Sequence, residues 1–516
     1  MKLANLIDAI QPAAVLGPAA LETPVLALHY RSDEVVPGGV FFAIPGFIAD
    51  GHTYIDDACR RGAVAVVAEK PHTATAPLLQ VASSRAALAQ AAAAYYDHPS
   101  RDLVLVGLTG TNGKTTVSYL LEAMLNRAGR STGVIGTVNY RHGDRIVPAA
   151  RTTPESLDLQ RLLAEMRRQG ASHVVMEVAS HGIELRRVDA CWFDVAAFIN
   201  LTQDHLDFHG DMECYWRSKK SLFTRILPAG PKGKRAVAVI NRDDPRGREL
   251  AAALAGQRPT ITFGRDAAND IRPEVRHNDL TGLQAVLHTP KGAVSVRSAL
   301  VGDHNLENIM TAAGCAVALD LPLEAVAAGV AATPAVPGRL EAVPDPRGRF
   351  IYVDYAHTPD ALENVLKALN ALRRRRLICV FGCGGDRDRS KRPLMGEIAG
   401  RLSDLAVLTS DNPRTEDPLA IIADVLEGVR RCAPRAYEIG RPPGPVAERG
   451  HIVVPDRRQA IRLAVRLAQA RDTILIAGKG HETYQIIGRA AIPFDDREEV
   501  DRALSEAAAR PGKERA

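Results

Sequence analysis

Residues 103–129 combine an apolar run, a glycine-rich polar segment and a helical pattern. The run 103–106 is predicted as a strand, and apolar residues recur every three or four positions after residue 116 until Gly129 ends the helix. In such a loop, glycines let backbone N–H groups approach phosphate oxygens, a lysine reaches the outer phosphates and a hydroxyl ligates magnesium. The residues suited to these roles are Gly110, Gly113, Lys114 and Thr115.

The loop departs from the common phosphate-binding pattern at Leu108, where that pattern has glycine. The alternative is that the glycines only form a tight turn between a strand and a helix. Gly-Lys-Thr-Thr at the junction of the two elements favours a triphosphate site over that alternative.

A carboxylate and an imidazole follow two later apolar segments. The predicted strand 173–177 ends at Glu177, and the strand 193–199 is followed by His205. Because polar groups at the carboxyl ends of parallel strands share one sheet edge, the two side chains suit a divalent ion that bridges phosphates. Taken singly, a core glutamate with its hydrogen bonds satisfied and a capping histidine remain the alternatives.

Lys219 lies on the apolar stripe of a predicted helix. Its neighbours at helical spacing are Tyr215, Trp216, Leu222 and Phe223. A lysine that points to the interior must be paired, neutral or chemically changed. The alternative is that its side chain extends along the helix face to water.

The composition is that of a globular chain with several domains. A length of 516 residues suggests about three domains. The net charge of +5 comes without a basic stripe interleaved with aromatics, so nucleic-acid binding is not expected. The seven cysteines show no metal-binding spacing, which predicts reduced thiols. Because no run of 18 apolar residues and no leader pattern occurs, we expect a cytoplasmic protein without membrane insertion.

The alternation of short apolar strands with helices restarts twice, which divides the chain into residues 1–100, 101–337 and 338–516. The predicted fold class is α/β with a small N-terminal domain, a central phosphate-loop ATPase-type domain with a parallel sheet, and a C-terminal doubly wound, Rossmann-like domain. In the third range, four polar loops follow predicted strands and are expected to meet at one sheet edge as a site. These loops are residues 354–359, 382–387, 411–414 and 478–482.

Seven short motifs, in order and spacing, make the chain similar to the Mur ligases along almost its whole length. They are Gly110-Thr-Asn-Gly-Lys-Thr, Thr152-Thr-Pro, Met176-Glu-Val-Ala-Ser-His, Asp204-His-Leu-Asp, Asp354-Tyr-Ala-His, Asp411-Asn-Pro-Arg and Gly478-Lys-Gly-His-Glu. One departure is Ala179, where the family usually has a serine. Any hydroxyl contact from that position is absent here.

The resemblance implies an ATP-dependent ligase that uses Mg²⁺, with successive domains for a uridine nucleotide, for ATP and for an amino acid. It implies that ATP phosphorylates the D-glutamate side chain of UDP-MurNAc-L-Ala-D-Glu, and that the amine of meso-diaminopimelate then attacks the acyl phosphate. These small-molecule substrates are the expected partners of a monomer.

The resemblance also assigns residues to each role. The catalytic set is Lys114, Glu177, His205 and Lys219, and the metal ligands are Thr115, Glu177, His205 and Lys219 modified to a carbamate. The ATP site comprises Gly110, Thr111, Asn112, Gly113, Lys114, Thr115, Thr116, Asn305, Arg339, Asp354 and His357. The UDP-MurNAc-dipeptide contacts are Tyr30, Ser32, Thr152, Thr153, Ser180 and Arg187. The diaminopimelate contacts are Arg387, Asp411, Asn412, Pro413, Arg414, Gly478 and Glu482.

Arg414 is the residue expected to select the amino acid. Pro413 fixes its own φ and pushes Asn412 toward an extended conformation, which makes the loop stiff. A guanidinium binds a carboxylate through two parallel hydrogen bonds, and diaminopimelate carries a far carboxylate that lysine lacks. The alternative is that Arg414 only braces its loop against Asp411.

Two rival functions belong to other classes. A folylpolyglutamate-type ligase shares the ATPase domain but does not explain the first hundred residues or the Asp-Asn-Pro-Arg loop. A regulatory ATP-binding switch needs the phosphate loop but no amino-acid site. ADP release that requires both substrates distinguishes the three.

Overall fold

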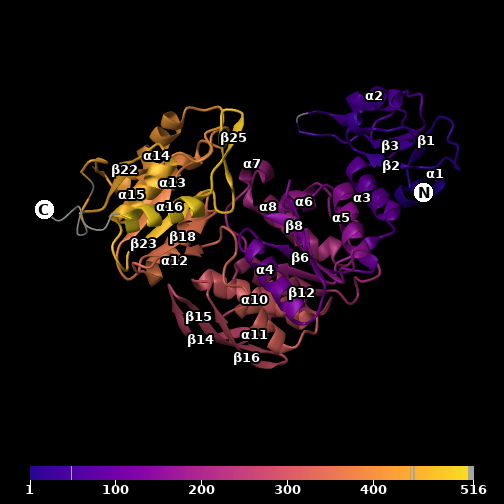
Figure 1. Ribbon diagram of the computed structural model, residues 1–516. Coiled ribbons are helices and arrows are strands. Elements are labelled where there is room, and N and C mark those ends of the chain that lie inside the picture. Colours follow the sequence, from indigo (N-terminus) through magenta and orange to yellow (C-terminus); the bar gives the residue numbers. More distant parts are fainter. Residues whose placement is uncertain (48, 442, 445–447, 510–516) are drawn as a thin grey trace.

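The computed structural model describes residues 1–47, 49–441, 443–444 and 448–509. Three α/β units follow one another along the chain, and the central unit lies between the other two (Figure 1). The predicted α/β fold class is confirmed. None of the helices in the described ranges is long and apolar enough to cross a bilayer.

The N-terminal sheet has the strand order β1-β5-β4-β3-β2, in which only β1 runs antiparallel to its neighbour. Side chains of a strand alternate between faces, so Val40 and Phe42 pack with α1 and α3, whereas Phe41 packs with α2. The elements are α1 Leu3–Ile10, β1 Ala14–Leu16, β2 Ala27–His29, β3 Gly39–Phe42, α2 Ile55–Arg60, β4 Ala65–Ala68, β5 Leu78–Gln80 and α3 Ser84–Tyr95.

The central sheet, ordered β13-β12-β11-β6-β10-β7-β8-β9, places β6 near its middle. The predicted strand, loop and helix are confirmed, because β6 ends at Thr109 and α4 begins at Lys114. One face of the sheet packs on α4, α10 and α11, and the other on α5, α8 and α9. The elements are β6 Val104–Thr109, α4 Lys114–Arg127, β7 Thr132–Ile135, α5 Ser156–Arg168, β10 His173–Glu177, α6 Ser180–Glu184, β11 Val195–Phe198, α7 Leu206–His209, α8 Met212–Ser221, β12 Val237–Asn241, α9 Pro245–Leu254, β13 Thr260–Phe263, α10 Asp303–Ala318 and α11 Leu323–Ala331.

The central unit is not purely parallel, which corrects the prediction. Strands β8 Asn139–His142 and β9 Arg145–Pro148 add an antiparallel hairpin to the sheet edge. Strands β14 Arg272–Asp279, β15 Gly282–Thr289 and β16 Gly292–Ser298 form a separate meander. Several of these strands are largely polar and carry little of the hydrophobic pattern that reveals a buried strand.

The meander also fixes the C-terminal unit. Leu280, in the turn between β14 and β15, packs into the core of that unit, and the Tyr352 hydroxyl donates to the Leu280 carbonyl at 2.8 Å. Arg374 bridges the two units by donating to Asp279 at 2.8 Å.

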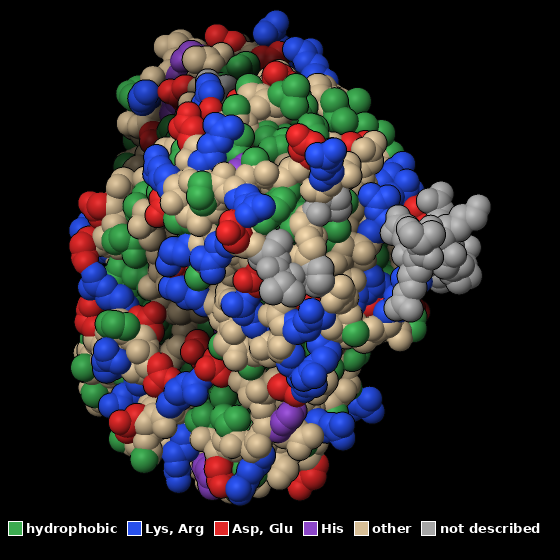
Figure 2. Space-filling view, turned by 90° about the vertical axis from the view of Figure 1, so that its left-hand side faces the viewer, with side chains coloured by type: hydrophobic (Ala, Val, Ile, Leu, Met, Phe, Trp, Pro, Cys, Tyr) green, Lys and Arg blue, Asp and Glu red, His purple; other side chains and the backbone are tan. Residues whose placement is uncertain are grey.

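Figure 2 shows the outer side of the C-terminal unit, where basic and acidic side chains are interspersed over the described surface.

The C-terminal sheet is doubly wound, as predicted, with the order β17-β18-β23-β19-β20-β22-β21 and only β17 antiparallel. The elements are β17 Glu341–Val343, β18 Phe350–Asp354, α12 Pro359–Leu372, β19 Leu377–Phe381, α13 Lys391–Leu402, β20 Leu405–Leu408, α14 Pro418–Cys432, β21 Arg435–Ala436, β22 Gly450–Val453, α15 Arg457–Leu467, β23 Thr473–Ala477, β24 Tyr484–Ile487, β25 Ala490–Pro493 and α16 Asp496–Ala509.

Candidate active site

The phosphate loop joins β6 to α4 and is shaped by close contacts. Gly113 has φ +88°, and a Cβ there would lie 2.2 Å from Asn308 Oδ1, so only glycine fits. Lys114 Nζ donates to the carbonyls of Gly110 at 2.7 Å and Thr111 at 2.8 Å, so its side chain folds back over its own loop. Desolvation lowers the pKa of Lys114, and Glu177 opposes that shift.

Glu177 ends β10 opposite Leu108 of β6 and is 1% exposed. Its carboxylate accepts from Thr115 Oγ1 at 3.0 and 3.1 Å. It also accepts from the N–H and the hydroxyl of Thr137, both at 2.9 Å. Thr137, which the sequence did not single out, therefore fixes the carboxylate beside the phosphate loop.

Thr115 and Glu177 provide hard oxygen donors in contact with each other, which suits Mg²⁺ completed by phosphate and water oxygens. Among the described residues, no group of three or more His, Cys, Asp or Glu side chains is placed to hold a metal by itself. The pair fits a magnesium site that depends on bound nucleotide rather than an all-protein cage.

Lys219 of α8 is 1% exposed, so the alternative in which its side chain reaches water is wrong. Its Nζ donates to the Gly110 carbonyl at 2.9 Å and lies 4.6 Å from the centre of the Tyr215 ring. Burial, and then the neighbouring Lys114, lower the pKa of Lys219 well below its ordinary value, while Asp204 opposes the shift. The side chain thus points at the phosphate loop.

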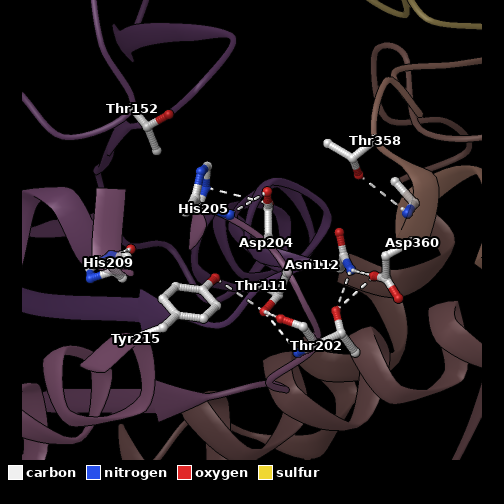
Figure 3. A network of polar contacts seen from close by, with 12 residues as sticks. Thr111, Asn112, Thr152, Thr202, Asp204, His205, His209, Tyr215, Thr358 and Asp360 are labelled. Atoms are coloured by element: carbon white, nitrogen blue, oxygen red, sulfur yellow. Dashed lines mark hydrogen bonds and ion pairs between the residues drawn. The ribbon is translucent and has the colours of Figure 1, made fainter. Parts of the chain in front are cut away.

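His205 precedes α7 with φ +55°, and its Nε2 lies 3.4 Å from Asp204 Oδ2. Burial lowers its pKa, Asp204 opposes the shift, and Lys114 and Lys219 add to it. Figure 3 shows His205 near Asp204, in the same polar network as Tyr215. His205 therefore lies on the side of the site where the two lysines are.

The residues expected to hold the muramoyl dipeptide gather around the end of β10. Thr153 Oγ1 donates to the Glu177 carbonyl at 2.9 Å, and Thr152 bonds Thr137 at 3.1 Å. Arg187 pairs with Glu155 at 2.8 Å. The Arg187 Nε is buried without a partner among the described residues.

The remaining dipeptide candidates lie on other elements. Ser180 Oγ lies 2.9 Å from His209 Nε2. Tyr30, in the N-terminal unit, donates to Asp158 of α5 at 2.8 Å, and Ser32 begins a short 3-10 helix rather than a loop. Tyr30 thus ties the first unit to the second.

The ATP candidates outside the loop divide into two groups. Arg339 shortly precedes β17, donates to Thr115 Oγ1 at 3.4 Å and lies over the Tyr355 ring. Asn305, Asp354 and His357 are instead bonded to nearby backbone carbonyls or N–H groups, and Asn305 Oδ1 also accepts from Asn308 Nδ2 at 3.0 Å. Arg339 is the one of these four that the structure connects to the phosphate loop.

One carboxylate of the C-terminal unit reaches the phosphate loop. Asp360, in the first turn of α12, accepts from Thr202 Oγ1 at 2.7 Å and from Asn112 Nδ2 at 3.1 Å (Figure 3). No local sequence pattern indicates this contact, because the partners are 158 and 248 positions away.

The polar loops of the C-terminal sheet edge meet as predicted. Asn412 Nδ2 donates to Glu482 Oε2 at 2.9 Å. Arg414, with φ +52°, donates to the Gly385 carbonyl at 2.7 Å, so it contacts the neighbouring glycine-rich loop rather than bracing against Asp411. Arg387 is exposed and bonds only the Asp386 carbonyl among the described residues.

The Gly478 backbone follows β23 at the same edge. Gly478 has φ +119° and donates its N–H to the Asp354 carbonyl at 3.0 Å. Pro413 lies beneath the glycine-rich loop, because a Cβ on Gly385 would meet its carbonyl oxygen. These contacts hold the loop ends in one arrangement.

Three family domains match the chain in order. They are the Mur ligase family catalytic domain over residues 25–96, the Mur ligase middle domain over 108–316 and the Mur ligase glutamate ligase domain over 338–480. A curated relative, the UDP-N-acetylmuramoyl-L-alanyl-D-glutamate–2,6-diaminopimelate ligase of Geobacter metallireducens, is 48% identical over 508 residues, which is 98% of this chain and 99% of the relative. The chain belongs to the Mur ligase family.

Solved structures agree with this membership. A structure of UDP-N-acetylmuramoyl-L-alanyl-D-glutamate–2,6-diaminopimelate ligase is 32% identical, with a TM-score of 0.70, and covers 98% of this Mur ligase and 99% of that chain. A Mycobacterium tuberculosis folylpolyglutamate synthase is 20% identical, with a TM-score of 0.59, over 76% of this chain and 92% of that one. The second likeness shows a shared fold alone.

In this Mur ligase, Glu177→Gln is expected to fold normally and to lower turnover on the order of 10²-fold, because the change keeps the side-chain shape and removes the charge beside the phosphate loop. The measurement is the steady-state rate at several magnesium concentrations, alongside the melting temperature. Glu122→Gln, in α4, changes a carboxylate bonded to Arg141 and serves as the control. An unchanged rate with unchanged magnesium dependence would count against a metal role.

Asp360→Ala is expected to loosen the contact between the C-terminal and central units, because two hydrogen bonds to a charged acceptor are lost. Small-angle X-ray scattering of the free Mur ligase should then show a larger radius of gyration. Glu363→Ala, on the same helix, removes a carboxylate that pairs only with Lys367 and Arg401 of its own unit among the described residues. Identical scattering from both variants and the wild type would refute the prediction.

Proposed function

We propose that this Mur ligase joins meso-diaminopimelate to the D-glutamate side chain of UDP-MurNAc-L-Ala-D-Glu, with conversion of ATP to ADP and phosphate, in peptidoglycan precursor synthesis. The observation that carries the proposal is the Asp360 contact, through which the C-terminal unit faces the phosphate loop. The 48% identity to a 2,6-diaminopimelate ligase along 98% of the chain supports the choice of amino acid.

The reaction has two displacements. An oxygen of the D-glutamate carboxylate attacks the γ-phosphorus of ATP, and ADP leaves. The amine of diaminopimelate then attacks the acyl carbon, the bond from that carbon to the phosphate oxygen breaks, and the amine loses a proton as the amide forms. The protein holds two polyanions in line and stabilises the charge that develops.

Lys114 and Arg339 are the cations assigned to the phosphates. Among the described residues, Lys114 donates only to carbonyls of its own loop, and phosphate oxygens would replace them when ATP binds. Arg339 reaches Thr115 from the C-terminal side, so it brings a guanidinium to the loop when the units are closed. Asn305, Asp354 and His357 are assigned to the nucleotide on the resemblance, beside Gly110 to Thr116 of the loop.

Magnesium held by Thr115 and Glu177 would neutralise phosphate charge. We assign Lys219, as a carbamate, and His205 to a second metal position. The lowered pKa of Lys219 supports this assignment, because a neutral amine attacks the carbon of CO₂ and gives a carbamate after it loses a proton. The carbamate would place an anion near Lys114.

The residues assigned to the other two substrates form two groups. Tyr30, Ser32, Thr152, Thr153, Ser180 and Arg187 are proposed to bind the UDP-MurNAc dipeptide. The unpartnered Arg187 Nε supports its part in that set. Arg387, Asp411, Asn412, Pro413, Arg414, Gly478 and Glu482 are proposed to bind diaminopimelate.

The organisation of the chain is proposed on the same basis. The domains are residues 1–100 for the uridine nucleotide, 101–337 for ATP and 338–516 for the amino acid, the last including residues 442, 445–447 and 510–516, which lie outside the described ranges. We propose a cytoplasmic monomer that acts on small molecules.

The folylpolyglutamate rival lacks support from the first hundred residues. They form a separate five-stranded sheet that matches a Mur ligase domain over residues 25–96. The likeness to the folylpolyglutamate synthase extends over 76% of this chain and shows the fold alone.

ADP release tests the proposed function. With no other nucleophile added, it is expected only when ATP, UDP-MurNAc-L-Ala-D-Glu and meso-diaminopimelate are all present. Release that needs a folate in place of the dipeptide would favour the rival ligase. Release without any amino acid would favour an ATP-binding switch.

A further inference from the structure

Lys479 is the fully buried lysine of the loop that follows β23, and the proposed function gives it no part. Its Nζ donates to Asn412 Oδ1 at 3.0 Å and to Glu482 Oε2 at 3.1 Å. Asp411 Oδ1 lies 3.5 Å away as a further ion-pair partner. The three partners all belong to the proposed diaminopimelate set, so one buried cation lies at the centre of that set.

The contacts around Lys479 fix the orientation of both side chains it bonds. Asn412 Oδ1 also accepts from the Ile486 N–H at 3.0 Å, while Asn412 Nδ2 donates to Glu482 Oε2. Gly480 has φ +54° and lies against Tyr355, where a Cβ would come within 2.6 Å of Tyr355 Cβ. The loop therefore has little freedom to turn Lys479 elsewhere.

Glu482 is left with two unlike oxygens. Oε2 accepts from both Asn412 and Lys479, whereas no hydrogen bond from the described residues reaches Oε1. The Glu482 side chain is 17% exposed, whereas Lys479 is wholly buried. Of the two, Glu482 is therefore the side chain that solvent and ligands reach, and it carries the Oε1 atom that has no partner among the described residues. A carboxylate clamped through one oxygen presents the other as an acceptor in a fixed direction.

The charges around Glu482 favour an ammonium group as the ligand. Asp411 and Glu482 carry two negative charges, and Lys479 offsets one of them. The nearby Arg457 forms a neutral ion pair with Asp496, with bonds of 2.7 Å to both carboxylate oxygens. One negative charge remains, which suits a single ammonium group.

We propose that Lys479 is a positioning residue for the incoming amino acid, which clamps Glu482 Oε2 and Asn412 so that Glu482 Oε1 receives an ammonium group of diaminopimelate. The inference rests on the proposed function and adds the residue that orders its amino-acid site. Without Lys479, Asp411 and Glu482 repel each other, and Glu482 loses the partner that sets its direction.

The test is Lys479→Met, which keeps most of the side-chain length and removes the charge and the donors. The KM for meso-diaminopimelate is expected to rise on the order of 10- to 100-fold, as for a lost hydrogen bond to a charged group, while the KM values for ATP and the UDP-dipeptide stay within about twofold. Lys367→Met makes the same change on exposed α12 and should leave all three constants unchanged.

A second measurement separates positioning from folding. Hydroxylamine attacks the acyl carbon of an acyl phosphate and releases phosphate, and it is small enough to need no amino-acid site. Lys479→Met is expected to form the hydroxamate from ATP and the UDP-dipeptide at the wild-type rate. Loss of hydroxamate formation, or an unchanged KM for diaminopimelate, would overturn the positioning role.

Turnover of the wild-type enzyme distinguishes failure of the proposed function from failure of this inference alone. Wild-type turnover with neither diaminopimelate nor hydroxylamine present would overturn the proposed function and this inference together. Diaminopimelate-dependent wild-type turnover, combined with an unchanged KM in Lys479→Met, would overturn the inference alone.

Discussion

Lys219→Ala is expected to lower turnover about 10³-fold or more without unfolding the protein. The side chain lies within hydrogen-bond distance of the Gly110 carbonyl and is buried beside a second lysine. If Lys219 is a carbamate, its loss removes an anion from the metal position and leaves a cavity of the same shape. Short carboxylic acids such as acetate should then restore part of the activity.

The modification has its own readout. Wild-type protein equilibrated with ¹³C-bicarbonate should give a carbamate carbon signal that Lys219→Ala lacks. Lys220→Ala is the matched control, because Lys220 is the adjacent lysine and pairs with Glu249 at 2.8 Å. Wild-type turnover in Lys219→Ala would end the proposal, and an identical carbon signal in both variants would exclude Lys219 as the modified residue.

Arg414→Ala is expected to remove the preference for meso-diaminopimelate over L-lysine, which should be roughly 10⁴-fold in the wild type. The Arg414 guanidinium donates one N–H to the Gly385 carbonyl, and its other side-chain donors have no partner among the described residues. The far carboxylate of diaminopimelate can pair with them, whereas bound lysine leaves the guanidinium without that partner.

The measurement is turnover with meso-diaminopimelate and with L-lysine, for the wild type and for Arg414→Ala. It shows whether Arg414 sets the preference between the two amino acids. Arg389→Ala is the control, because Arg389 follows the loop 382–387, is exposed and pairs with Asp424. The assignment fails if the wild type uses both amino acids equally. It also fails if Arg414→Ala retains the full preference.

The local parts of the site were predictable from the sequence. The strand, loop and helix around Lys114 follow from periodicity and glycine placement, and the apolar neighbours of Lys219 already indicated its burial. Both signals lie within a few residues along the chain, so they can be read without knowing which distant residues the loop and Lys219 contact.

The parts that were missed depend on distant partners. Thr137 contacts Glu177 across 40 positions, Lys479 contacts Asn412 across 67, and Asp360 contacts Thr202 across 158. A single threonine, lysine or aspartate on a loop or a helix end has no local pattern that distinguishes it from a solvated residue. The strand order within one sheet brings the first two pairs together, and the packing of the C-terminal unit on the central unit brings the third together.

The most direct test of the account follows one oxygen atom. The D-glutamate side-chain carboxylate of the UDP-dipeptide is labelled with ¹⁸O at both oxygens, and the phosphate released with ATP and meso-diaminopimelate is analysed by mass. Because a carboxylate oxygen bonds the γ-phosphorus and leaves with it, each phosphate should carry one ¹⁸O and each amide should retain the other. Unlabelled phosphate would contradict the acyl phosphate and with it the proposed ligase chemistry.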